Sequence, residues 1–214
     1  MAGLFIAFEG PEGGGKSTQI ARLGKRLRSQ GVDPILTREP GGTPTGDAIR
    51  RVVLDPALDV APVTEFLLYS ASRAQHVAQV LAPALDGGRV VVSDRFAGAS
   101  FAYQGYGRGL ELQFIEELTG RVTAGLRPHL TVLLDLDPAA GLERISARAN
   151  SDRLEQADLQ FHRRVRQGFL KQAAGSDDWI VLDATLPEGE LADSIWNRVS
   201  RLLPGRRAVP DDRR

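Results

Sequence analysis

The chain has 214 residues, 27 basic and 27 acidic side chains, a formal net charge of zero and no cysteine. This length suits one domain that buries its core without metal or disulfide cross-links. The missing cysteine excludes disulfides, thiolate metal sites and a cysteine nucleophile. Balanced charge argues against a broad nucleic-acid or membrane surface, and no apolar run approaches the roughly 18 residues of a membrane span. The first ten residues lack the basic region of a secretory signal, so we expect a cytoplasmic protein without nucleic-acid polymer or membrane partners.

Short apolar runs alternate with longer helical patterns along the chain. Strands are expected at Leu4–Phe8, Pro34–Thr37, Val90–Val92, Leu130–Leu136 and Trp179–Leu182. The alternation predicts βαβ units, and uninterrupted apolar strands predict a parallel sheet covered on both faces. We therefore expect one doubly wound α/β domain of about five strands over residues 1–203. Residues 204–214 are polar and charged, and we expect them to form a disordered tail.

The longest helical pattern runs from Thr64 to Leu85. Steps of four and three predict one buried apolar stripe, formed by Leu67, Ala71, Ala74, Ala78 and Leu81. On another face, Phe66, Tyr69 and Arg73 recur at i, i+3 and i+7. An aromatic ring one turn from an arginine can stack a base beside a phosphate-binding group. The alternative is that Tyr69 only packs and Arg73 lies at the surface.

The first strand runs into a glycine-rich loop with the spacing of a phosphate-binding loop. Residues 10–17 read Gly-Pro-Glu-Gly-Gly-Gly-Lys-Ser, which matches G-x-x-x-x-G-K-[ST] between a strand and a helix. Glycines let consecutive N–H groups converge on an anion, and the helix N-terminus favours negative charge. Lys16 adds a positive charge for the β- and γ-phosphates, and the Ser17 hydroxyl is a ligand for Mg²⁺. The residues expected to bind the triphosphate here are Gly10, Pro11, Glu12, Gly13, Gly14, Gly15, Lys16, Ser17 and Thr18.

Charged residues follow the second and third strands, at the edge where open α/β sheets bind ligands. Asp94 ends the third strand and can hold Mg²⁺ as a Walker-B aspartate does, and Arg95 follows it directly. Arg38, in the loop Thr37–Thr43, is placed for a second anion. A surface Asp–Arg pair and a solvated loop arginine are the alternative interpretations.

Two further segments carry polar groups that suit a second small molecule. In the run 100–105, Ser100 and Gln104 can read a base edge and Tyr103 can wall a sugar, although a plain surface helix is the alternative. The arginine-rich run 144–153 has the default interpretation of a solvated helical face. Its alternative is a lid, at about residues 144–156, that carries arginines onto a transferring phosphoryl group and excludes water.

Taken in order, these motifs resemble the thymidylate kinase family from Leu4 to about Leu203. They are Phe8-Glu9-Gly10-x-Glu12-Gly13-x-Gly15-Lys16-Ser17, Thr37-Arg38-Glu39-Pro40-Gly41-Gly42-Thr43, Ser72-Arg73, Asp94-Arg95, Tyr103-Gln104-Gly105 and Asp152-Arg153-x-Glu155. The resemblance implies a three-layer P-loop kinase fold with a five-stranded parallel sheet and a short helical lid. It also implies a homodimer that transfers the γ-phosphoryl group of ATP to dTMP with Mg²⁺, giving dTDP and ADP. The alternatives are a kinase for another nucleoside monophosphate or a deoxynucleoside, and a nucleotide-dependent switch protein.

The resemblance further implies roles for individual residues. Glu12 would contact the acceptor 3′-hydroxyl, Tyr69 would stack on thymine and Tyr103 would crowd the sugar 2′ position. Gly13 stands where one branch of the family has a catalytic arginine, so this chain resembles the branch that supplies the arginine from the lid. Arg153 is one candidate for that arginine, although it could instead pair with Glu155.

Four sets of site residues follow. The expected catalytic residues are Lys16, Asp94, Arg95, Arg148 and Arg153. Arg144 is expected to join the phosphate-binding loop in binding ATP. The expected acceptor-binding residues are Glu12, Arg38, Phe66, Tyr69, Arg73, Arg95, Ser100, Tyr103 and Gln104. The expected metal ligands are Ser17 and Asp94.

Overall fold

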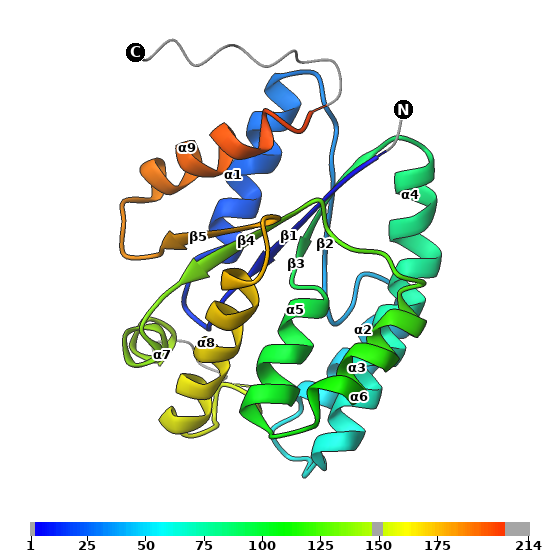
Figure 1. The fold of residues 1–214 in the computed structure, drawn as a ribbon, viewed down its shortest axis with the longest axis vertical. Helices are drawn as coiled ribbons and strands as arrows, with labels where there is room; N and C mark the ends of the chain where they lie inside the picture. The colour runs from blue at the N-terminus through cyan, green and yellow to red at the C-terminus, as the bar shows by residue number, and fades with distance from the viewer. Residues whose placement is uncertain (1–2, 147–151, 204–214) are drawn as a thin grey trace.

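The computed structural model describes residues 3–146 and 152–203, which form helices packed on both faces of a parallel sheet (Figure 1). The strands are β1 (Leu4–Glu9), β2 (Ile35–Arg38), β3 (Val90–Asp94), β4 (Leu130–Asp135) and β5 (Trp179–Asp183). Their order in the sheet is β2-β3-β1-β4-β5, and every pairing is parallel. The predicted five-stranded parallel sheet of an α/β kinase fold is confirmed. The predicted tail lies outside the described residues.

The helices follow the strands in the predicted alternation. They are α1 (Lys16–Ser29), α2 (Pro44–Leu54), α3 (Pro62–His76), η1 (Val77–Leu81), α4 (Ala82–Asp86), α5 (Ala97–Ser100), η2 (Phe101–Gly107), α6 (Leu112–Val122), α7 (Pro138–Ser146), α8 (Leu159–Ala174) and α9 (Glu188–Val199). Two segments, η1 and η2, are π-helical, a geometry frequently found at functional sites. Among the described residues, no helix combines the length and apolarity needed to cross a bilayer.

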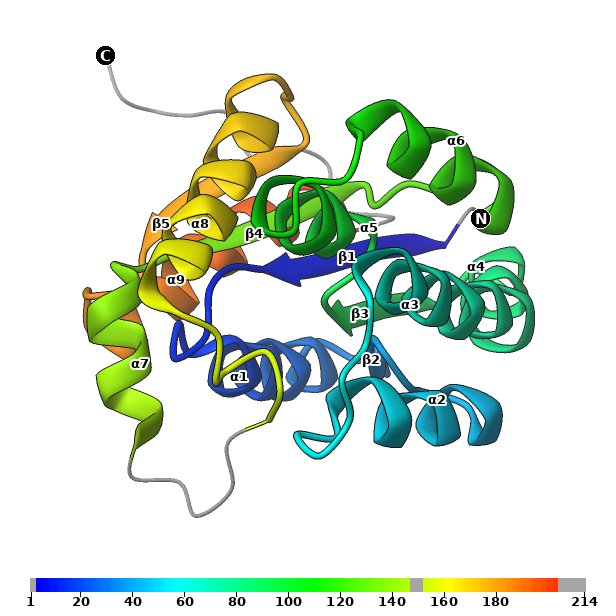
Figure 2. The same ribbon diagram turned by 90° about the horizontal axis from the view of Figure 1, so that it is seen from below.

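Two apolar layers hold the helices to the sheet. On one face, α1 and α9 pack through Ile20, Leu23, Leu191 and Ile195 against side chains of β1, β3 and β4. On the other face lie α3 with its continuation into α4, α5 with η2, and α8. Figure 2 shows α1 on one side of β1 and α5, α6 and α8 on the opposite side. The three central strands are therefore covered on both faces, as their apolar sequences predict.

Strand register brings three functional loops to one edge of the sheet. β1 pairs with β3 so that Phe8 lies opposite Asp94, and β3 pairs with β2 so that Asp94 lies opposite Arg38. Since parallel strands all end at the same edge, the glycine-rich loop at residues 10–15 faces the segments that follow Asp94 and Arg38. This register creates the crevice in which the candidate site lies.

The prediction that the apolar stripe of the helix from Thr64 is buried is wrong. Leu67 is 48% exposed, Ala71 and Ala78 are exposed, and only Leu81 of the predicted set is fully buried. The inward face of α3 instead carries the residues Glu65, Phe66, Tyr69, Ser70, Ser72, Arg73 and His76. Apolar spacing identifies an apolar face, but it cannot distinguish a face that meets the core from one on the surface when the inward face is polar.

Truncation of Leu81 tests where the core lies. We expect Leu81→Ala to lower the free energy of unfolding by about 2–5 kcal/mol, because a fully buried leucine leaves a cavity when it is truncated. Urea denaturation measures this change. The control is Leu186→Ala, whose side chain is exposed, and its effect should stay within about 0.5 kcal/mol. Equal losses in the two variants would contradict the assigned burial.

Candidate active site

The glycine-rich loop between β1 and α1 has the geometry of an anion cradle. Gly13 and Gly15 adopt φ values of 73° and 84°, which side chains other than glycine rarely allow. A Cβ atom on Gly13 would lie 2.4 Å from the carbonyl oxygen of Gly141 on α7. Lys16 is buried, and its Nζ donates to the carbonyl oxygens of Gly10 at 3.0 Å and Pro11 at 2.9 Å. The loop therefore holds the Lys16 ammonium against its own carbonyl oxygens, in a glycine conformation from which consecutive N–H groups can converge on an anion.

The two predicted metal ligands come together beside this loop. Ser17 Oγ donates to Asp94 Oδ2 at 3.3 Å, which joins the first turn of α1 to the end of β3. Mg²⁺ commonly takes one or two protein oxygens and completes its octahedron with phosphate oxygens and water. A hydroxyl and a carboxylate at the N-terminus of α1 fit that ion. The described residues contain no group of three or more acidic or histidine side chains placed to hold a metal without a phosphate ligand.

Arg95 is held tightly against the phosphate-binding loop. Its Nη1 donates to the Gly10 carbonyl oxygen at 3.0 Å, and its Nη2 donates to Glu12 Oε1 at 2.5 Å and to Tyr103 Oη at 3.0 Å. The Tyr103 hydroxyl in turn donates to Glu12 Oε1 at 2.7 Å. Arg95 also has φ of 70°, a strained conformation for a side-chain-bearing residue and one that clusters at functional sites.

Two acidic residues beside this arginine have opposite pKa shifts. Burial alone would raise the pKa of Glu12, but Arg95, Lys16 and the Tyr103 hydrogen bond outweigh it and lower the pKa to about 2. Burial raises the pKa of Glu9 to about 7, against the lowering effects of Arg95 and Lys16. Glu12 is therefore an anion throughout the physiological range, whereas Glu9 changes its charge within that range.

A cavity of about 310 Å³ brings most of the predicted site residues together. It is large enough for a small-molecule ligand. The predicted residues that line it are Glu12, Gly13, Gly14, Gly15, Lys16, Ser17, Thr18, Arg38, Tyr69, Asp94, Arg95, Ser100, Tyr103, Gln104 and Arg144. Arg144 Nη1 donates to the Gly13 carbonyl oxygen at 3.3 Å, which places α7 against the phosphate-binding loop.

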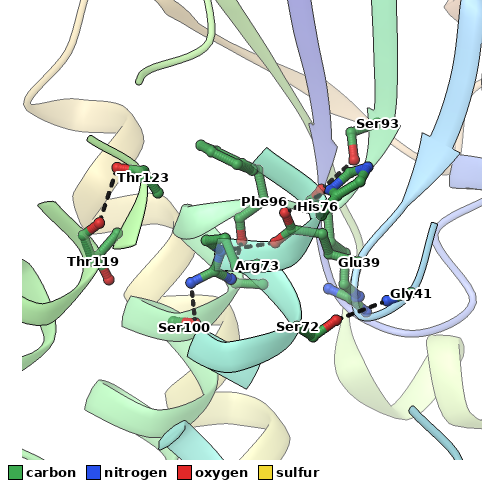
Figure 3. A network of polar contacts seen from close by, with 12 residues as sticks. Glu39, Gly41, Ser72, Arg73, His76, Ser93, Phe96, Ser100, Thr119 and Thr123 are labelled. Carbon is green, nitrogen blue, oxygen red and sulfur yellow. Dashed lines mark hydrogen bonds and ion pairs between the residues drawn. The ribbon is translucent and has the colours of Figure 1, made fainter. Parts of the chain in front are cut away.

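Arg73 lies behind the cavity wall in a network of polar contacts (Figure 3). It is fully buried, with Nε donating to Glu39 Oε2 at 2.7 Å, Nη1 to Ser100 Oγ at 3.0 Å and Nη2 to the Phe96 carbonyl oxygen at 3.0 Å. His76 Nδ1 is 2.9 Å from Glu39 Oε1. The network thus connects the loop after β2 with α3 and with α5, so Arg73 fixes the position of Ser100 in the wall.

Other predicted site residues have different surroundings. Phe66 is buried against Phe114, with ring centroids 5.4 Å apart, and does not line the cavity. Arg153 also does not line it; its Nη2 donates to Glu65 Oε2 at 2.5 Å instead of pairing with Glu155. Gly10 and Pro11 contribute their carbonyl oxygens to Lys16. Arg148 lies outside the described residues.

Three charged residues in and beside the cavity are not predicted as site residues by the sequence. Arg50, on α2, lines it and donates to the Pro40 carbonyl oxygen at 3.0 Å. Glu9 and Glu65 are buried carboxylates in the layer behind the wall. Glu9 lies within the quoted motif Phe8-Glu9-Gly10, so only its role was missed. No local pattern marks Arg50 or Glu65, because their importance comes from partners far away in the chain.

The fold and the cavity define a class of enzyme. A phosphate-binding loop with its lysine and serine, an aspartate at the end of the neighbouring strand and arginines around one cavity are the parts of a P-loop phosphotransferase. Residues 8–195 match the family model described as "Thymidylate kinase". The chain belongs to the thymidylate kinase family, and this membership makes it an ATP-dependent nucleoside monophosphate kinase.

Curated relatives agree with this assignment over nearly their whole lengths. The chain is 61% identical over 199 residues to the thymidylate kinase of Deinococcus radiodurans, an alignment that covers 92% of this chain and 97% of the relative. It is 49% identical over 206 residues to that of Halothermothrix orenii, with 95% and 99% covered. It is 50% identical over 204 residues to that of a Synechococcus species, with 94% and 96% covered.

The raised pKa of Glu9 predicts a pH dependence of stability. Between pH 4.5 and about 7 the folded protein retains a proton on Glu9 that the unfolded chain has lost, so the free energy of unfolding falls as pH rises through this window. The fall assigned to Glu9 is up to about 3 kcal/mol. We expect Glu9→Gln to remove this part of the dependence in urea denaturation at pH 5 and pH 8.

Comparison with an exposed carboxylate isolates the contribution of Glu9. Glu188→Gln removes an acid whose side chain is largely exposed, and this variant should retain the wild-type dependence on pH. Other titrating groups are common to all three proteins and cancel in the comparison. If Glu9→Gln and wild type lose the same free energy between pH 5 and pH 8, the raised pKa of Glu9 is refuted.

Proposed function

We propose that this chain transfers the γ-phosphoryl group of MgATP to dTMP, giving dTDP and ADP, with the residue roles described below. The observation that carries the proposal is one cavity in which the phosphate-binding loop faces the Glu12–Arg95–Tyr103 cluster. The first group suits a donor triphosphate and the second suits the sugar and phosphate of an acceptor. ATP is a cytoplasmic metabolite, so the same proposal places the reaction in the cytoplasm.

On the donor side, the catalytic work is positioning and charge stabilisation. Main-chain N–H groups of residues 13–18 and the Lys16 ammonium hold the triphosphate, with Arg144 beside them. Mg²⁺, when bound by Ser17 and Asp94, neutralises charge on the β- and γ-phosphate oxygens. Arg95 is fixed by its bonds to Gly10 and Glu12, so its guanidinium can face the transferring group without further ordering.

On the acceptor side, the cavity offers groups that complement a pyrimidine deoxynucleotide. Burial and the nearby Glu65 carboxylate raise the pKa of Tyr69, so its hydroxyl group stays protonated. A base would stack on the aromatic ring of the same residue. Gln104 Nε2 donates to Glu65, which leaves the amide oxygen to accept from a base N–H. Ser100 Oγ accepts from Arg73 and retains a hydroxyl hydrogen for a base carbonyl. Arg38 also lines the cavity and can bind the acceptor phosphate.

An acceptor panel tests the proposed reaction. We expect ADP release to depend on dTMP and on Mg²⁺, and to be much slower with AMP, GMP or thymidine. Lys16→Ala should remove nearly all turnover, because the buried ammonium is the charge aimed at the β- and γ-phosphates. Lys25→Ala, an exposed lysine on the same helix, should leave turnover unchanged. ATP consumption that ignores every added acceptor would overturn the proposal.

We also propose that two copies of this chain form a dimer through α2, α3 and α6. On one side of the molecule, α3 packs against α2 and against α6 (Figures 1 and 2). Exposed apolar side chains recur on all three, at Val52, Val63, Leu67 and Leu112. The apolar side chains on the outer face of α3 recur at helical spacing, a pattern that favours burial, yet they are exposed in the single chain. Contact with a second copy of the chain would bury them, which supports the dimer.

A charge on α3 tests the dimer. Leu67→Glu should convert the protein from a dimer to a monomer in size-exclusion chromatography with light scattering, because a carboxylate in an apolar interface is unpaired. Leu186→Glu, which adds the same charge after β5, should remain dimeric. A monomeric wild-type protein, or a Leu67→Glu variant that stays dimeric, would contradict this interface.

A further inference from the structure

Glu65 is a buried carboxylate at the start of α3 that does not line the cavity. Its side chain is fully buried, yet it accepts hydrogen bonds from three side chains in two other segments, η2 with its C-cap and residues 152–155. Gln104 Nε2 donates to its Oε1 at 2.8 Å, Arg108 Nη2 donates to its Oε2 at 3.1 Å, and Arg153 Nη2 donates to the same oxygen at 2.5 Å. A carboxylate buried at this depth is tolerated only because charged partners satisfy it.

Arg153 points away from the cavity and toward this carboxylate. The side chains on either side of it, Asp152 and Leu154, line the cavity, whereas Arg153 does not. Its Nε donates to the Val53 carbonyl oxygen at 3.1 Å, and its main-chain N–H donates to the Leu54 carbonyl oxygen at 3.2 Å. Arg153 therefore binds the end of α2 and the start of α3 through three separate donors.

The segment around Arg153 is stiffened by its own hydrogen bonds. Asp152 Oδ1 accepts from the main-chain N–H groups of Leu154 and Glu155, each at 2.9 Å. Glu155 Oε2 accepts from the Asp152 N–H at 3.0 Å. A turn closed in this way moves as a unit, so whatever holds Arg153 also holds the cavity-lining side chains of Asp152, Leu154 and Glu155.

We infer that Glu65 and Arg153 form a positioning pair that fixes residues 152–155 in the cavity wall, and that Arg153 acts through Glu65 and not by contact with the transferring phosphoryl group. The same carboxylate orients Gln104, so one buried anion sets two parts of the wall. The kinetic side of this inference rests on the proposed function. Its structural side does not, because it concerns the hydrogen bonds of the free protein.

The kinetic consequence follows from a shift in conformational population. When the pair is removed, residues 152–155 occupy their cavity-lining position for a smaller fraction of the time. Apparent affinity falls by that fraction, while the rate at saturation is retained. Arg153→Met should therefore raise KM for ATP or for dTMP about tenfold or more, and kcat should change by less than about threefold. An arginine that stabilised the transferring group would instead lower kcat by about a thousandfold.

A double-mutant cycle links the two residues. Glu65→Gln should raise the same KM, and the double variant Glu65→Gln/Arg153→Met should resemble Glu65→Gln alone, because the contact is already lost. The matched control is the exposed pair Arg22–Glu188, in which Arg22→Met and Glu188→Gln should each leave both constants unchanged. Independent, multiplying effects of Glu65→Gln and Arg153→Met, or a fall in kcat confined to Arg153→Met, would overturn the inference.

Amide hydrogen exchange provides a second readout that requires no activity. In wild type, the amides of Leu154 and Glu155 should be protected by Asp152, and this protection should fall at least tenfold in both single variants. The core strand β1 should retain its protection, which shows that the variants are folded. Unchanged protection at Leu154 and Glu155 would refute the positioning pair. Absence of dTMP kinase activity in wild type with the exchange result intact would refute only the proposed function.

Discussion

The parallel pairing of β1 with β3, in the register that sets Phe8 opposite Asp94, is the constraint on which the rest of the site depends. It places the phosphate-binding loop beside Asp94 and Arg95, within hydrogen-bond distance of Ser17 and Glu12. A shift of one residue would send each side chain of β3 to the opposite face of the sheet and separate these groups. Apolar burial on both faces of the central strands holds the register, so the core of the fold and the geometry of the site have the same origin.

Around this edge, the protein buries several charged side chains in the layer behind the cavity. Glu39 and Glu65 are each satisfied by arginines that come from other elements, and Arg73 and Arg153 are satisfied by those carboxylates. Buried ion pairs contribute little net stability when compared with apolar packing, but they are strongly unfavourable when one partner is removed. Their effect here is geometric, because each pair fixes cavity-lining side chains on two or three segments at once.

The arginines in and around the site therefore divide into two kinds. Arg38, Arg50, Arg95 and Arg144 reach the cavity itself. Arg73 and Arg153 lie one layer further back and bind carboxylates. A formal net charge of zero conceals this division, since the acids that balance the arginines include the ones that hold them in place.

The sequence by itself determined the alternation of strands and helices, the phosphate-binding loop and the functional residues at the ends of the strands. These features depend on periodicity, glycine placement and short spacing, which are local properties. Only the tertiary structure decided that Phe66 packs on Phe114 and that the apolar face of α3 lies on the surface. It also decided that Arg153 binds Glu65 and not Glu155. These outcomes depend on which distant residues come into contact. Arg153 is 88 positions from Glu65 in the chain, and a pattern of a few neighbouring residues cannot predict a contact at that separation.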